Sequence, residues 1–327
     1  MRDGPCINAS QYTRGIFLHF KRAVNYHHMH SLPAYLILPL LLGLLYSVSA
    51  MAYKRAMAEG VDIWRIIFYS NLTTALLLLP LLVFAEKPLP DASFHQPLVA
   101  SLSFFVGIIL NVFALHRGDV SVATPVLGAK VLFVALFTIL FLAEPVQPSL
   151  WLAAVLVVLS ILLLRGPRRK PVVRFWSTVF CAMGSSASFA LCDVSFQAWS
   201  RIWGFGLFIP LVFTWVCAMT FGLRYFFPEP CSPFSRRTYG WLVTGCVLNG
   251  LQTLGMFICI SLFRHANAAT AINIVYNSRV IWSVLLVWML GHWFGNIERE
   301  QGINVMVSRF AGSILILTAI MITLLGH

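Results

Sequence analysis

Two basic residues occur inside long apolar runs, where a charge is costly. Lys130 lies in the apolar run 120–142 and Arg279 in the run 267–290. If each run forms a membrane-spanning helix that rises about 1.5 Å per residue, both charges lie near the middle of the bilayer. A Lys or Arg at that depth costs about 3 kcal/mol on insertion scales. We therefore expect both side chains to face the interior of a helical bundle or a wet cavity.

The acidic residues offer few partners for these two cations. Among the 11 Asp and Glu residues, only Asp193 falls clearly inside a predicted helix. We therefore expect an anionic substrate to supply the missing negative charge. Lys130 would act as a point charge and Arg279 as a planar fork for carboxylate or phosphate. The alternative is structural: Lys130 pairs with Asp193, while Arg279 binds backbone carbonyls or stacks on an aromatic ring.

Polar side chains accompany Arg279 along the same predicted helix. At helical spacing, Tyr276, Arg279 and Ser283 share one face, and Asn273 and Asn277 lie on the adjoining arc. A polar arc of this width is unfavourable against lipid and favourable against a ligand. We expect these residues to bind substrate, with interhelical hydrogen bonding as the alternative.

Further polar candidates lie on other predicted helices. Asn249 and Gln252 are three residues apart and share a face, so they are candidates for substrate binding. The first predicted helix offers weaker candidates in Tyr46, Ser47 and Ser49. Asn111 is alone on its helix, and we expect it to serve packing. Asp193 is also a candidate for proton coupling, because an acid inside the membrane must be paired or protonated.

The composition requires a membrane around these helices. Of the 327 residues, 59% are hydrophobic and only 10% are charged, whereas a soluble domain is typically about a quarter charged. A helix needs about 20 apolar residues to cross a bilayer. The breaks between apolar runs predict ten such helices, near 33–53, 64–85, 97–115, 120–142, 149–165, 175–197, 204–227, 238–262, 267–290 and 303–325. Pro125 cannot donate a backbone hydrogen bond, so we expect it to kink the fourth helix and free carbonyl groups near Lys130.

The chain divides at a basic segment that contains two prolines. Residues 167–173 predict a linker between a first five-helix repeat, 33–166, and a second, 174–327. Because five is odd, the second repeat would enter the membrane in the opposite direction, and such inverted repeats typically bind substrate between them. Residues 1–32 form a basic leader, for which a short interfacial helix is one interpretation. The predicted fold is an all-α polytopic membrane protein with ten transmembrane helices in two inverted five-helix repeats.

Several classes of function are disfavoured. The 23 Lys and Arg residues mostly lie between apolar runs, where they set membrane topology, so we do not expect nucleic-acid binding. The seven cysteines show no pair spacing, so neither a metal site nor a disulfide is expected. The segment His116-Arg117-Gly118-Asp119 reads as a short loop rather than as a catalytic group. We expect a protein that is not an enzyme and carries no cofactor.

Short motifs around the fourth predicted helix carry a family resemblance. A small-residue turn leads into Thr124-Pro125-Val126-Leu127, and the helix runs on to Leu142-Ala143-Glu144-Pro145. On these residues the sequence resembles the drug/metabolite transporter superfamily, in particular its ten-helix, EamA-like members. The second half departs from the pattern, because Leu290-Gly291-His292-Trp293 stands where the family's glutamate would be. The resemblance implies two five-helix repeats and transport of a small molecule through a central cavity between them.

Together these observations predict a secondary active transporter. It would export or exchange a small anionic or zwitterionic metabolite by alternating access around a cavity at the membrane midplane. One alternative is the same fold exporting neutral or cationic compounds, such as amino acids or drugs. Another is a membrane receptor or structural protein that does not transport. The expected partners are the substrate and the lipid bilayer, a homodimer is left open, and the expected location is the bacterial inner membrane.

Overall fold

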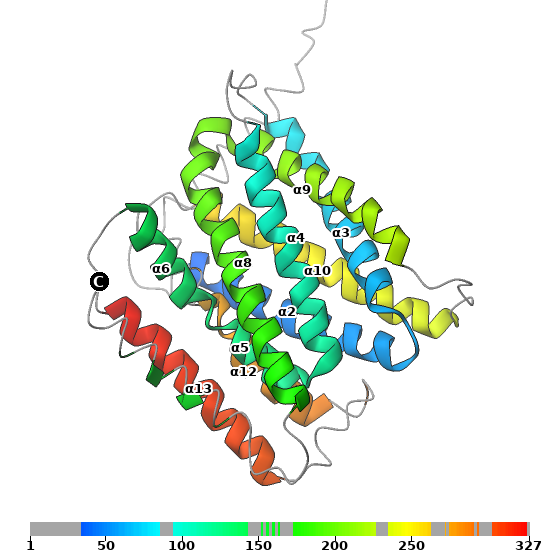
Figure 1. The fold of residues 1–327 in the computed structure, drawn as a ribbon, viewed down its shortest axis with the longest axis vertical. Coiled ribbons are helices and arrows are strands. Elements are labelled where there is room, and N and C mark those ends of the chain that lie inside the picture. The colour runs from blue at the N-terminus through cyan, green and yellow to red at the C-terminus, as the bar shows by residue number, and fades with distance from the viewer. Residues whose placement is uncertain are drawn as a thin grey trace, which may run out of the picture.

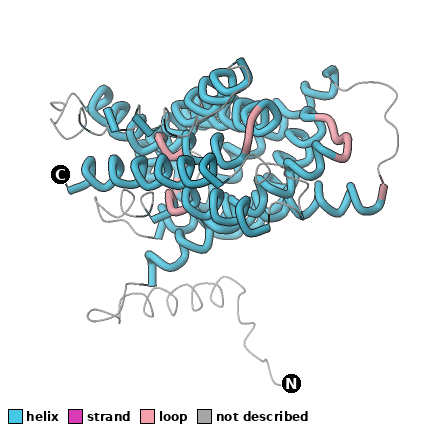
Figure 2. Tube along the Cα trace, turned by 90° about the horizontal axis from the view of Figure 1, so that it is seen from below, coloured by secondary structure: helices cyan, strands magenta, loops and turns pink. Residues whose placement is uncertain are grey.

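The computed structural model describes most of the apolar part of the chain. It covers residues 34–85, 94–142, 173–226, 235–262, 275–290 and 303–325, with a few single positions between these ranges. In these residues all the regular secondary structure is helical (Figure 2). The predicted leader and nearly all of the predicted linker lie outside the described residues.

Three helices open the described part of the chain. They are α2 (Ala34–Ala58), α3 (Ile63–Leu78), which continues as the 3₁₀ helix η1 (Leu79–Phe84), and α4 (His95–Arg117). Asp62 begins α3 by accepting a hydrogen bond from the amide of Trp64 at 3.0 Å, which satisfies a backbone donor that has no partner within the helix. All three helices correspond to predicted ones, and α2 and α4 extend slightly beyond their expected ends.

The fourth predicted helix is broken, and the expectation of one continuous helix is therefore wrong. It consists of α5 (Val120–Leu127) and α6 (Lys130–Leu142), separated by a turn at Gly128 and Ala129. In the turn the amide of Gly128 donates to Pro125 O at 2.8 Å, and the amide of Ala129 donates to Val126 O at 3.0 Å. Because Pro125 has no amide proton, α5 lacks a hydrogen bond just before this point. Lys130 is consequently the first residue of α6 rather than a mid-helix residue.

The second half begins with a long helix and contains a second break. Its described helices are α8 (Val173–Trp203), α9 (Phe205–Gly222) with the 3₁₀ helix η2 (Leu223–Phe226), α10 (Arg236–Leu262), α12 (Arg279–Leu290) and α13 (Ile303–Leu325). The predicted helix 267–290 is interrupted by a turn at Asn277 and Ser278, and α12 begins at Arg279. The two basic residues singled out in the sequence therefore each follow a helix break.

The lengths and surfaces of the helices fit a multi-pass membrane protein. Among the described residues, six helices are long and apolar enough to cross a membrane: Ile37–Ala58, Ile63–Phe84, His95–Arg117, Phe175–Phe196, Gly206–Phe226 and Arg236–Cys259. Three further apolar helices are shorter. Large apolar side chains point outward, for example Phe180, which is 71% exposed. The predicted fifth helix, 149–165, lies mostly outside the described residues, so the count of ten stays a prediction.

The helices of the two halves are interleaved. α4 lies along α8, as Figure 1 shows, and α2 packs on α10. The shorter helices α5 and α12 pack against each other. Each of these contacts joins residues before the linker to residues after it, so any space between them is lined by both halves.

Candidate functional site

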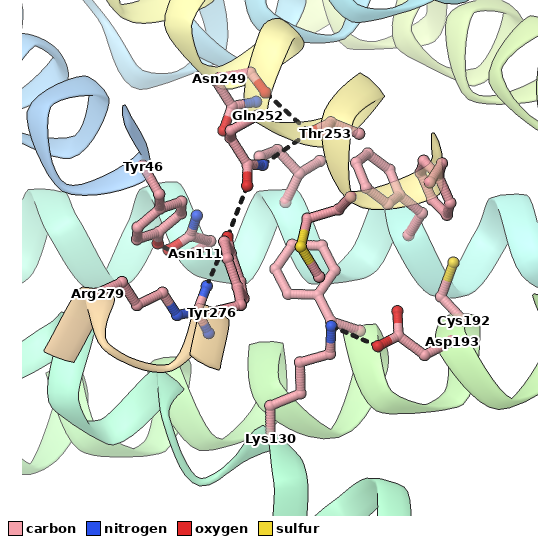
Figure 3. Close-up of a pocket in the computed structure, with 15 residues that line it drawn as sticks. Tyr46, Asn111, Lys130, Cys192, Asp193, Asn249, Gln252, Thr253, Tyr276 and Arg279 are labelled. Carbon is pink, nitrogen blue, oxygen red and sulfur yellow. Dashed lines mark hydrogen bonds and ion pairs between the residues drawn. The ribbon is translucent and has the colours of Figure 1, made fainter. Parts of the chain in front are cut away.

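A cavity lies between the two halves, beside both helix breaks (Figure 3). The centre of a water molecule can occupy about 70 Å³ of this cavity. At roughly 10–15 Å³ per water on that measure, this is room for about five waters, or for a small organic molecule. Nine polar side chains line the cavity: Tyr46, Asn111, Lys130, Asp193, Asn249, Gln252, Thr253, Tyr276 and Arg279.

Arg279 is held by aromatic rings and a backbone carbonyl. Its guanidinium carbon lies 4.7 Å from the ring centroid of Tyr46 and 4.6 Å from that of Tyr276, within the range of cation–π attraction. One terminal nitrogen donates to the Tyr276 hydroxyl and the other to Leu127 O, both at 3.1 Å. Its Nε is buried without a hydrogen bond. Among the described residues, the ion pairs found do not include Arg279.

Lys130 is paired with Asp193. Their Nζ and Oδ2 atoms are 2.6 Å apart, and the two side chains are only 12% and 10% exposed. Lys130 therefore forms the ion pair with Asp193 that the sequence offered as the structural alternative to a substrate site. Arg279 likewise makes both contacts of that alternative, one with a backbone carbonyl and one with aromatic rings. Both basic side chains nevertheless border open space, because both line the cavity.

Hydrogen bonds connect the other polar residues of the cavity into two chains. Tyr276 donates to Oε1 of Gln252 at 2.6 Å, and Nε2 of Gln252 donates to the Thr253 hydroxyl at 2.8 Å. Separately, the Tyr46 hydroxyl donates to Oδ1 of Asn111 at 3.1 Å. The two tyrosines that hold Arg279 are therefore each oriented by an amide side chain from another helix.

The turn before Arg279 is held by the first helix of the other half. The Ser47 hydroxyl of α2 donates to Arg279 O at 3.1 Å. A Cβ atom at Gly43, one turn earlier, would lie 2.9 Å from Tyr276 O and 3.1 Å from the amide nitrogen of Arg279. Glycine is therefore required at position 43 for this close approach of α2 to the break.

The turn before Lys130 is held in a corresponding way by α8. The Ser186 hydroxyl lies 3.4 Å from Val126 O and 3.3 Å from Leu127 O, which are carbonyls at the end of α5. Leu127 O also accepts from Arg279. A helical amide donates to the carbonyl four residues earlier, so the amide that Pro125 lacks would have served Ser121 O. Leu127 O is instead available because α5 ends at the turn, and the carbonyls there bind Ser186 and Arg279 rather than Lys130.

The structure brings together most, but not all, of the residues predicted for substrate binding. Those that line the cavity are Lys130, Arg279, Tyr276, Asn249 and Gln252, together with Asp193. Asn277 is buried but is not part of the lining. Ser283 donates to Val280 O in its own helix at 2.9 Å and also lies away from the cavity. Asn273 lies outside the described residues.

Sequence reasoning missed two contributors and undervalued a third. Asn111, expected to serve packing, lines the cavity and orients Tyr46. Thr253 was not singled out, although it follows Gln252 directly and lines the same space. Tyr46, treated as the weaker candidate, contacts the guanidinium itself. Nothing in the sequence places Tyr46 beside Arg279, which is 233 positions away, so only the tertiary contact identifies this role.

A third basic side chain is buried at one end of the bundle. Arg309 of α13 is fully buried, and its guanidinium lies 2.6 Å from Oδ2 of Asp119 and 2.6 Å from the Ser121 hydroxyl. Asp119 precedes α5, so this ion pair ties the last helix to the first half of the chain. The expected loop over residues 116–119 is shorter than predicted, because His116 and Arg117 end α4 and only Gly118 and Asp119 connect it to α5.

Another polar contact joins the halves where α2 ends. Glu59 accepts a hydrogen bond from Thr238 of α10 at 2.8 Å and pairs with Arg55 at 2.7 Å. Desolvation works against ionisation of Glu59, but the hydrogen bonds from Thr238 and Arg55 outweigh it and lower the pKa of the carboxyl group. This carboxylate therefore fastens α2 to α10 in its charged form.

Within the described part of the chain, no group of three or more His, Cys, Asp or Glu side chains is placed to hold a metal ion. The cavity itself offers one carboxylate, from Asp193, and one thiol, from Cys192. A cationic side chain, Lys130, already neutralises that carboxylate. The cavity lining therefore combines an internal ion pair with the cationic side chain of Arg279.

Comparison with known proteins agrees with this architecture. Residues 33–166 match the model of the EamA-like transporter family, a family of transporters rather than enzymes. No curated protein matches the sequence. Among the solved structures, 28 chains match, and one, described as "Crystal structure of protein", superposes with a TM-score of 0.59 at 12% identity. That match covers 87% of this chain and 96% of the other, and it shows a shared fold alone. Residues 33–166 are therefore an EamA-like transporter domain of the drug/metabolite transporter superfamily, within a multi-pass integral membrane protein.

Proposed function

We propose that the protein is a secondary transporter of a small anionic or zwitterionic metabolite. The family match implies membrane transport of small molecules. We choose an anion because of the environment of Arg279. This side chain is buried at the cavity wall, and the ion pairs found among the described residues do not include it. A buried guanidinium is strongly stabilised by a carboxylate or phosphate that binds both of its edges.

In this proposal the cavity binds the anion mainly through Arg279. Tyr46 and Tyr276 stack on the guanidinium and keep it at the cavity edge. Its Nε is free to donate a further hydrogen bond. The ion pair of Lys130 with Asp193 is neutral as a unit, so Arg279 supplies the net positive charge of the site. Asn249, Gln252 and Tyr276 orient the ligand, and Asn273 remains a candidate on the same segment.

The transport step in this proposal is alternating access between two inverted five-helix repeats, 33–166 and 174–327. The reciprocal contacts support this arrangement: Ser47 of α2 binds the break before α12, and Ser186 of α8 binds the break after α5. The family match over residues 33–166 agrees with a first unit of these bounds. Broken helices with a site between repeats are typical of transporters that rock one repeat against the other. The proposed location is the bacterial inner membrane.

Asp193 is the candidate for proton coupling in this scheme. Of the described acids, it is the one that lines the cavity, and it already contacts Lys130. A substrate carboxylate that approaches Lys130 would compete with Asp193 for the ammonium group, which would couple substrate binding to this acid. In proteoliposomes, Asp193→Asn should abolish the dependence of uptake on a pH gradient while exchange of substrate continues. Unchanged dependence on the gradient would exclude this role.

Uptake into proteoliposomes tests the proposed function. Radiolabelled small carboxylates, phosphorylated compounds and neutral compounds of similar size are compared for the wild type and for Arg279→Gln. We expect uptake of anions that falls at least about tenfold in Arg279→Gln, since truncating one partner of a buried charged contact costs about 2 kcal/mol or more. Arg224→Gln is the matched control, because Arg224 is exposed in η2. Equal uptake of anions by wild type and Arg279→Gln would exclude the proposal.

A second candidate function has an observation in its favour. Lys130 is neutralised by Asp193, and Arg279 already has a carbonyl and two tyrosine rings as partners. With the cations held internally, the same cavity would carry neutral or cationic compounds. The uptake assay distinguishes the two functions, because this candidate predicts transport of neutral compounds that survives Arg279→Gln.

A further inference from the structure

The cavity has a second wall that is apolar and rich in aromatic rings. It consists of Phe104 and Ile108 of α4, Phe189 of α8, and Met256 and Phe257 of α10. The ring centroids of Phe104 and Phe189 are 5.5 Å apart. Phe104 and Phe257 both pack on the fully buried Phe213, with distances between ring centroids of 4.8 Å and 5.6 Å respectively. These rings pack on one another, so the wall is preformed before any ligand arrives.

The polar and apolar walls lie at different depths of the bundle. Lys54 of α2 donates to Leu115 O at the end of α4, and Glu59, which directly follows α2, accepts from Thr238 at the start of α10. The C-terminal end of α4 and the N-terminal end of α10 therefore lie at the same end of the molecule. Moving away from that end, α4 presents Asn111 before Ile108 and Phe104.

Along α10 the order of side chains is the same. Asn249 and Gln252 come first, and Met256 and Phe257 follow. At about 1.5 Å per residue, the apolar side chains (the aromatic layer) lie about 5–12 Å, or one to two helical turns, beyond the amide side chains (the polar layer) on the same helices. Arg279 belongs to the polar layer, because its tyrosine partners are bonded to Asn111 and Gln252. The net positive charge of Arg279 therefore lies at one depth of the cavity. The aromatic surface lies at another, where Asp193 follows Phe189 by one turn of α8 and pairs with Lys130.

We infer that the ligand is an amphipathic carboxylate, with its charged group at Arg279 and a compact apolar or aromatic group between Phe104, Phe189 and Phe257. This inference rests on the proposed anion site and adds the chemistry of the rest of the ligand. A purely polar anion would leave the aromatic layer in contact with water, which is unfavourable. A neutral apolar compound would leave Arg279 without an anion.

Gly107 sets the width of the aromatic layer. An added Cβ at this position would lie 2.8 Å from two ring carbons of Phe189, closer than carbon atoms approach. The Ser185 hydroxyl donates to Gly107 O at 2.8 Å and holds α8 against α4, so the helices do not easily separate. A methyl group at position 107 must therefore displace the ring of Phe189, which lines the cavity. Gly107 is thus a positioning residue for ligand size.

Calorimetric titration of the purified full chain with acetate, benzoate and benzamide tests the inference. Acetate supplies the charge alone, benzamide the ring alone and benzoate both. We expect benzoate to bind at least about tenfold more tightly than either of the others, because its ring buries apolar surface in the aromatic layer. Equal affinities for acetate and benzoate would overturn the inference and leave the anion site intact. Equal affinities for benzoate and benzamide, unchanged in Arg279→Gln, would overturn both the anion site and this inference.

Two substitutions locate the ring of the ligand. Phe189→Leu and Gly107→Ala should each lower the preference for benzoate over acetate at least about threefold, while binding of acetate stays within about twofold. Phe180→Leu is the control for the first, because Phe180 lies on the same helix but faces outward. Gly222→Ala is the control for the second, because a Cβ there meets no atom within 4 Å. A benzoate preference that is unchanged in both Phe189→Leu and Gly107→Ala would overturn the placement.

Discussion

Arg279, the first residue of α12, donates a hydrogen bond to the carbonyl oxygen of Leu127, the last residue of α5, at 3.1 Å. The two residues are 152 positions apart in the sequence. The carbonyl is available because α5 ends at a turn instead of continuing into α6. The contact thus joins the two helix breaks directly and places the guanidinium between them, at the cavity wall.

Replacement of Arg279 by Lys should separate the role of its charge from the role of its shape. Lysine keeps the charge but loses the planar fork and the stacking on two tyrosine rings. We expect Arg279→Lys to weaken anion binding about tenfold in calorimetric titration, and Arg279→Gln to weaken it further. Full affinity in Arg279→Lys would mean that a point charge is sufficient at this position.

Removing one member of the Lys130–Asp193 ion pair should destabilise the folded protein more than removing both members. Asp193→Leu leaves the buried Lys130 ammonium without its partner, which typically costs about 3 kcal/mol or more. Lys130→Met combined with Asp193→Leu removes both charges and should cost less than Asp193→Leu alone. Thermal unfolding of the purified protein measures both. If the double variant is less stable than the single one, the two side chains do not act as a pair.

Gly43→Ala should loosen the turn that precedes Arg279. The new methyl group would lie 2.9 Å from Tyr276 O and would push α2 away from the break. Overpacking of this kind typically costs about 1–3 kcal/mol. We expect a lower midpoint of thermal unfolding and weaker binding of anions, because the position of Arg279 depends on this contact. In Gly222→Ala, where the space is open, both quantities should stay near the wild type.

The contact of Glu59 with Thr238 predicts a specific dependence of stability on pH. The pKa of Glu59 is lowered in the folded protein, so its carboxylate stabilises the fold above the pKa of the unfolded chain. That contribution is lost as the pH falls through the lowered pKa. The wild type should therefore lose more thermal stability than Glu59→Gln between about pH 6 and pH 3. Parallel curves for the two proteins would show that this carboxylate does not contribute.

Much of the membrane architecture follows from the sequence alone. Apolar runs of about 20 residues have few stable alternatives to helices in lipid, because every backbone polar group must find a partner within the chain. The predicted helices accordingly overlap α2, α3, α4, α8, α9, α10 and α13 closely. Lys130 and Arg279 are also visible in the sequence, since a charge in an apolar run has to be buried in protein.

The partners of those charges were decided by the tertiary structure. Whether Lys130 pairs with Asp193, and which carbonyl Arg279 reaches, depends on how each helix is rotated and where it is broken. Asn111 looked isolated on its own helix, yet it faces Tyr46 of α2 across the bundle. Residue type and spacing act locally and therefore determine which segments enter the membrane. The cavity forms from side chains on six separate segments, so only their packing defines which residues line it.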